Sequence, residues 1–124
     1  MSIALITIVG RTLLAALFIL AGIAKIIGPK PFREHMVAYH VPPIVLPLVV
    51  MLELGAGIAL LLGWQLLFAA GGLALFCATT AVVFHRDLAD RAERTLFFKD
   101  LALAGALLVM TSSAWPMAAV ASIG

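Results

Sequence analysis

The chain has 124 residues, of which 65% are apolar and only 11% are charged, and its mean hydropathy is +1.20. A soluble domain of this length needs a much larger polar surface, so the composition excludes one and indicates a protein that lies in a lipid bilayer. The net charge of +2 would suggest an anionic partner in a soluble protein, but here we interpret it as a sign of membrane topology and expect no nucleic-acid partner.

Four stretches are long and apolar enough to cross a bilayer core about 30 Å thick, which takes roughly 20 residues of helix. They are Ile3–Ile27, Ile44–Gly63, Leu66–Phe84 and Leu96–Trp115. They leave no room for a soluble catalytic domain, so the sequence predicts an all-α membrane protein, a four-transmembrane-helix bundle that forms one domain over residues 1–124. Nothing basic precedes the first apolar run and three more follow, so we expect a span there and not a signal peptide.

The segment between the first two predicted spans contains a further predicted element. Pro29 and Pro31 end the first helix, because proline lacks the backbone donor that a helix interior needs. Phe32, Met36 and Tyr39 then recur at helical spacing in PFREHMVAYH. This pattern predicts a short amphipathic helix at the membrane interface, with a solvated loop as the alternative.

Basic residues are distributed unevenly about these spans. Seven of the eight Lys and Arg residues lie in or beside the loops 28–43 and 85–95, and none lies on the opposite side, where Gly63–Gln65 and the termini are placed. Cytoplasmic loops carry the excess of Lys and Arg in membrane proteins. The sequence therefore predicts that both loops are cytoplasmic and that both termini lie outside.

Glu53 is the one charged residue of the second predicted span, nine residues from one end and ten from the other. A lone carboxylate at mid-membrane would be protonated, whereas a cationic partner would keep it ionised. Because the first two helices run antiparallel, counting residues from their outer ends brings Arg11 to a similar depth. We therefore predict an ion pair between Arg11 and Glu53.

Arg11 and Lys25 are fourteen residues apart and therefore share one face of the first helix, with Ala15, Phe18 and Gly22 between them. A stripe of small residues and cations fits a protein-facing surface better than a lipid-facing one. We expect this face to look into the bundle.

A second polar layer is predicted where the helices reach the cytoplasm. Lys25 would be joined there by His85 and by either Lys99 or Asp100, which point about 100° apart on one helix. Two interpretations stay open: the cluster binds a ligand or relays protons, or its ion pair only fixes the helix register. For His85 the simpler interpretation is an interfacial histidine. The complete candidate cluster is Arg11, Lys25, Glu53, His85, Lys99 and Asp100.

Several kinds of site are missing from the sequence. Cys77 is the only cysteine, so there is no disulfide and no Cys-x-x-Cys motif. No spacing of His or Cys suggests a metal, haem or iron–sulfur site, and there is no phosphate-binding loop or Ser–His–Asp set. We assign no catalytic residue, no metal site and no intrinsic cofactor. A redox role would need a partner's cofactor or a lipid-soluble carrier such as quinone.

Three segments in order resemble the DoxX family of small bacterial membrane proteins: RTLLAALFILAGIAKIIGP, LELGAGIALLLGW, and FHRDLADRAERTLFFKDLALAGALL. The resemblance covers roughly residues 8–110. It implies a four-helix bundle in the bacterial inner membrane, with Arg11, Lys25, Glu53 and the pair Lys99–Asp100 on the family's recurring polar positions. The chain departs from the family at position 100, where Asp replaces the more usual Asn, so the charge of the inner site differs.

The resemblance also implies a functional context, because the family takes its name from similarity to the DoxD and DoxA subunits of a thiosulfate:quinone oxidoreductase. Our first hypothesis is a membrane subunit of an oxidoreductase system that binds a quinone or small anion between helices. The second is a non-enzymatic scaffold or assembly factor that anchors a soluble partner through the cytoplasmic loops. The third is a small proton-coupled transporter that works as a homo-oligomer, since four spans are few for transport. Fold alone does not separate these hypotheses.

Overall fold

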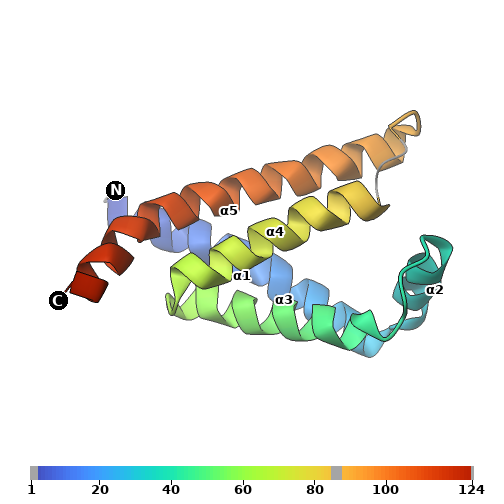
Figure 1. Cartoon of the computed structure of the whole chain (residues 1–124), viewed down its shortest axis with the longest axis horizontal. Coiled ribbons are helices and arrows are strands. Elements are labelled where there is room, and N and C mark those ends of the chain that lie inside the picture. The colour runs from blue at the N-terminus through green and yellow to red at the C-terminus, as the bar shows by residue number, and fades with distance from the viewer. Residues whose placement is uncertain (1–2, 85–87, 124) are drawn as a thin grey trace. The chain divides into compact units, whose positions relative to one another are not determined.

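The computed structural model describes residues 3–84 and 88–123, with side chains for all of these except residue 4 and residues 112–123. This part of the chain contains five α-helices (Figure 1): α1 Ile3–Ile27, α2 Lys30–Ala38, α3 Val45–Leu62, α4 Leu66–Phe84 and α5 Arg91–Ile123. They form two compact units, Met1–Trp64 with α1 to α3 and Gln65–Gly124 with α4 and α5. The prediction of an all-helical chain is confirmed.

Three of the helices are long and apolar enough to cross a membrane, over Leu5–Ile27, Val45–Leu62 and Leu66–Phe84. They coincide with the first three predicted spans to within two residues at each end. The fourth predicted span lies inside α5, and its part from residue 112 onward falls outside the described side chains. The count of four spans therefore stays a prediction.

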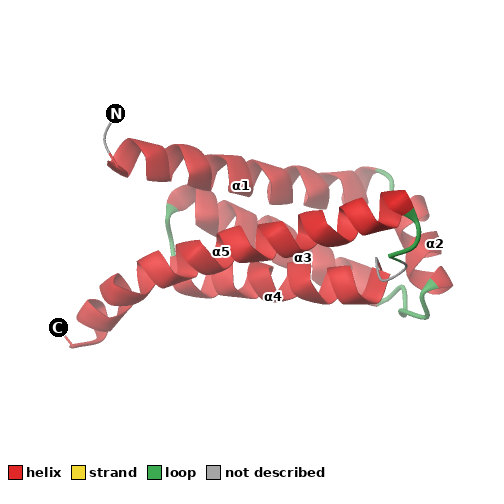
Figure 2. Ribbon diagram, turned by 90° about the horizontal axis from the view of Figure 1, so that it is seen from above, coloured by secondary structure: helices red, strands yellow, loops and turns green. Residues whose placement is uncertain are grey.

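In the first unit, α1 and α3 lie side by side (Figures 1 and 2) and run antiparallel. Pro47 lies in the first turn of α3, where no intrahelical donor is needed. The helix ends at Gly63, which takes the left-handed φ of +73°. The N–H of Trp64 then donates to the carbonyl of Ala59 at 2.9 Å, which is the closing hydrogen bond of a Schellman motif.

The predicted short helix between the spans is confirmed as α2, which lies at the end of the hairpin where α1 ends and α3 begins (Figure 2). Pro31 occupies its first turn, where proline is tolerated. Met36 is buried and Phe32 is half-buried, so this face of α2 packs on the protein, whereas Tyr39 follows the last helical residue. Its placement at the membrane interface stays a prediction.

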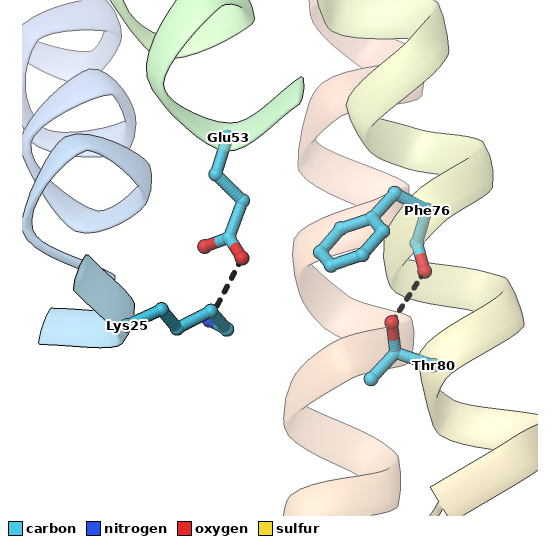
Figure 3. A network of polar contacts seen from close by, with 4 residues as sticks. All are labelled: Lys25, Glu53, Phe76 and Thr80. Atoms are coloured by element: carbon cyan, nitrogen blue, oxygen red, sulfur yellow. Dashed lines mark hydrogen bonds and ion pairs between the residues drawn. The ribbon is translucent and has the colours of Figure 1, made fainter. Parts of the chain in front are cut away.

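In the second unit, α4 packs against α5 through small side chains. The buried residues of α4 recur at intervals of three and four, which is the spacing of one helix face, and Ala104 and Leu107 are buried on α5. The hydroxyl of Thr80 donates to the carbonyl of Phe76 at 2.7 Å (Figure 3). Threonines in membrane helices bond to their own backbone in this way. The buried residues of α4 are Ala69, Ala70, Leu73, Ala74, Cys77 and Ala81.

Candidate functional site

The most buried charge described in the chain belongs to Glu53, in the middle of α3, and its partner is Lys25 near the end of α1. The two side chains point toward one another (Figure 3), with Nζ of Lys25 2.7 Å from Oε1 of Glu53. The Lys25 and Glu53 side chains are only 16% and 2% exposed. At this distance the two charges form an ion pair, and Oε1 has no other partner among the described residues. The attraction between the two charges is strong in these low-dielectric surroundings, and removing one partner alone would leave a buried charge uncompensated.

Close packing of α1 on α3 brings the pair together. A Cβ added at Gly57 would lie 3.0 Å from Cγ1 of Ile19 and 3.5 Å from the carbonyl oxygen of Ala15. A Cβ added at Gly22 would lie 2.7 Å from Cγ of Leu54. The two glycines therefore let the helix backbones approach, as small residues do between membrane helices.

Lys25 reaches Glu53 because of the direction in which helical side chains lean. A Cβ added at Gly22 would lie 3.6 Å from the Cβ of Glu53, so these two positions are level across the hairpin. Lys25 lies about one turn later on the same face of α1. Helical side chains lean toward the N-terminus, so the four-carbon stem of Lys25 carries its ammonium back to the level of Glu53.

The predicted ion pair between Arg11 and Glu53 is wrong. The guanidinium of Arg11 lies at the other end of α3, where a Cβ added at Gly63 would be 3.2 Å from its central carbon. The depth count failed because α1 extends eight residues beyond this point, back to Ile3, which is about 12 Å of helix. The shared stripe of α1 is confirmed, since Ala15, Phe18 and Gly22 are buried along it.

The position of Arg11 gives it a structural role. The last carbonyls of α3 carry the negative end of the helix dipole, and a cation there is favourable. Arg11 is half-buried beside this end. We infer that it stabilises the closure of the hairpin and takes no part in the Lys25–Glu53 site.

Replacing Gly63 by alanine is expected to lower the free energy of unfolding by about 1–2 kcal/mol, because alanine disfavours a left-handed φ and its methyl would displace the Arg11 guanidinium. Denaturant unfolding in mixed micelles measures this. The cost should fall when Arg11 is also alanine, because the displaced group is then absent. Gly55→Ala is the control, since nothing lies within 4 Å of an added Cβ there. An equal cost in both backgrounds would contradict the contact with Arg11.

An open groove of about 420 Å³ borders the pair at the end of the hairpin where α1 ends. Its charged lining consists of Lys25 and of Arg33 from the first half of α2. The Lys25 ammonium also lies over the ring of Phe32, 4.9 Å from its centroid, which is a cation–π contact. Lys25 therefore joins the buried carboxylate to the groove. The remaining lining residues are Ile26, Pro29, Pro43, Ile44, Leu46, Pro47, Val50 and Met51.

Three further predicted site residues belong to the part of the chain from Gln65 onward. His85 lies outside the described residues. Lys99 and Asp100 belong to α5 in the second unit, where Lys99 is exposed and Asp100 is half-buried, so Asp100 lies on the more covered face. The ring that would join them to Lys25 stays a prediction. Sequence reasoning missed the roles of Phe32 and Arg33. The signal for them was the prolines on both sides of α2, which fold this helix back against the end of α1.

The side chains of the Lys25–Glu53 site can support only a few kinds of chemistry. An ammonium with three donors can hold an anion or a carbonyl oxygen while it keeps its carboxylate partner. No cluster of three or more His, Cys, Asp or Glu residues that could hold a metal ion occurs within the described parts of the chain. The site is therefore suited to binding and to proton exchange.

Apolar helices of membrane-spanning length, polar connections and a buried ion pair between two spans define a polytopic helical membrane protein. The chain belongs to the DoxX family, whose profile matches residues 6–86. It is also 38% identical over 107 residues to the inner membrane protein YqjF of Escherichia coli, which covers 83% of this chain and 79% of that protein. No solved structure matches the chain significantly.

Proposed function

We propose that the chain is a multi-pass subunit of an oxidoreductase system in the bacterial inner membrane, and that Lys25 binds a quinone or a small anion from the groove. One observation carries this proposal: Lys25 lines the open groove and also pairs with the buried carboxylate of Glu53. The similarity to a protein named for the inner membrane supports the location. Four spans with cytoplasmic loops remain the expected topology.

Lys25 and Glu53 would have different roles in this function. The Lys25 ammonium would donate to a quinone carbonyl or to an anionic oxygen. The Glu53 carboxylate would balance the ammonium when the groove is empty and could exchange a proton when a ligand takes part of that charge. In this proposal the electrons would come from a partner protein, which carries the redox cofactor.

The test compares two variants of the purified chain in their affinity for a short-chain quinone, measured by native mass spectrometry in mild detergent. Glu53→Gln alone frees the ammonium, and Lys25→Gln added to it removes the ammonium without leaving a buried carboxylate unpaired. We expect the double variant to bind about tenfold more weakly than Glu53→Gln, the loss of one charge-assisted hydrogen bond.

Arg11→Gln is the matched control, because it removes a cation from the same face of α1, at the other end of α3, and should leave the affinity unchanged. Equal affinities in Glu53→Gln and the double variant would remove Lys25 from the site. If neither the wild type nor any variant binds quinone or small anions, the result favours the scaffold hypothesis.

A further inference from the structure

The groove at the end of the α1–α3 hairpin carries an excess of one positive charge. Its charged lining is Lys25 and Arg33, and among the residues that the structure describes Glu53 is the only carboxylate paired with either. Among the described residues, no acidic group lies within 4.0 Å of the Arg33 guanidinium. The groove therefore has two cations and one paired carboxylate, and an anionic ligand would match the charge of the remaining cation.

At the predicted membrane interface, Arg33 would lie at the level of the headgroup phosphates. The apolar span of α1 ends at Ile27, and Arg33 follows six residues later on the exposed side of α2. This is the level at which a chain leaves the hydrocarbon for the headgroups. The guanidinium presents several N–H donors in a planar fork that matches phosphate oxygens.

The rest of the groove is apolar and continues onto the surface of the two spans. Among its lining residues, Ile26, Ile44 and Met51 are 58%, 80% and 70% exposed. In a spanning helix hairpin such side chains face acyl chains. A free anion would use only the two cations, whereas an amphiphile with one anionic end would use the cations and the apolar wall together.

We propose that this groove binds one anionic phospholipid, whose phosphate contacts Lys25 and Arg33 and whose acyl chain lies along Ile44, Val50 and Met51. A phospholipid such as phosphatidylglycerol carries one net negative charge and so matches the surplus of the groove, whereas the choline of phosphatidylcholine offsets the charge of its phosphate. Basic pockets at the cytoplasmic ends of membrane helices recognise anionic headgroups by this combination of charge and depth. Because Lys25 has three donors, it can contact the phosphate while it stays paired with Glu53.

The experiment is native mass spectrometry of the full chain in mild detergent, titrated with phosphatidylglycerol or with phosphatidylcholine of the same acyl chains. The wild type should retain one phosphatidylglycerol at concentrations where phosphatidylcholine is lost. Arg33→Gln should weaken phosphatidylglycerol binding about tenfold, as expected for one charge-assisted contact. Lys30→Gln is the matched control, since it removes an exposed cation from the same helix outside the groove, and it should change the affinity by less than about twofold.

Two further arms separate a lipid from a soluble anion. Inorganic phosphate, added alone, should bind far more weakly than phosphatidylglycerol, and Met51→Ser should weaken the lipid about threefold or more without affecting phosphate, because it removes apolar contact. The proposal is overturned if phosphatidylcholine binds as tightly as phosphatidylglycerol, if Arg33→Gln and Lys30→Gln behave alike, or if inorganic phosphate binds as well as the lipid. A quinone and the lipid would compete for the Lys25 ammonium, but Arg33 takes no part in the proposed quinone contact, so the comparison of Arg33→Gln with Lys30→Gln, made without quinone, tests the lipid proposal alone.

Discussion

Replacing Lys25 by methionine is expected to lower the free energy of unfolding by about 3–5 kcal/mol, because it leaves the buried Glu53 carboxylate without its counter-ion. Methionine keeps most of the apolar stem and removes only the charged end. The effect should be large here because Glu53 is almost fully buried and lies in the middle of a helix of membrane-spanning length. Unfolding in mixed micelles, followed by helical circular dichroism, measures it.

A double-mutant cycle identifies the cause. Adding Glu53→Gln to Lys25→Met should recover most of the lost stability, because the buried charge is then gone as well. Lys30→Met is the control for losing a cation from this region. Because Lys30 is exposed, we expect this variant to change the free energy of unfolding by no more than about 0.5 kcal/mol. If the double variant were as unstable as Lys25→Met alone, the stem of Lys25 and not its charge would be the source of the effect.

The features of this protein that depend on one helix alone could be predicted from the sequence. The face of α1 that carries Arg11, Ala15, Phe18, Gly22 and Lys25 follows from helical periodicity alone, and the structure confirms it. The bounds of α3 followed from the run of apolar residues and the prolines before it. Each of these predictions needs only the geometry of a single helix.

The partner of Glu53 depends on the register between α1 and α3. The lengths of the two spans do not determine this register. Counting from the outer ends assumed that the start of α1 lies level with the end of α3, but α3 ends beside Arg11 and not beside Ile3. The register is fixed by the close contacts at Gly22 and Gly57. These glycines were visible in the sequence as a sign of tight packing, but not as a pairing between particular residues.

The groove was beyond sequence reasoning for a related reason. It depends on α2 folding back so that Phe32 lies under the Lys25 ammonium and Arg33 lines the opening. The amphipathic pattern of α2 predicts which face is covered, but not what covers it. A short helix held between proline-rich turns acquires its partner only from the tertiary structure.

Gly57→Leu should have the second largest effect, a loss of about 3 kcal/mol in the free energy of unfolding. A Cβ at this position would already meet the Ile19 side chain and the backbone of α1 at 3.0–3.5 Å. A leucine would therefore have to push α1 away, at the upper end of what overpacking costs in a well-packed interior. Because Gly57 lies one turn from Glu53, the same displacement should lengthen the Lys25–Glu53 contact.

Gly55→Leu is the matched control for the Gly57 prediction, because it adds the same side chain to the same helix where no atom lies within 4 Å of an added Cβ. It should leave the stability unchanged or raise it by up to about 1 kcal/mol, the difference in helix propensity between glycine and leucine. A similar loss of stability from both variants would mean that an added side chain destabilises α3 whether or not α1 lies close to it. A loss confined to Gly57→Leu, together with weaker phosphatidylglycerol binding at the groove, would show that the close helix contact is what holds Lys25 between the buried carboxylate and the headgroup level.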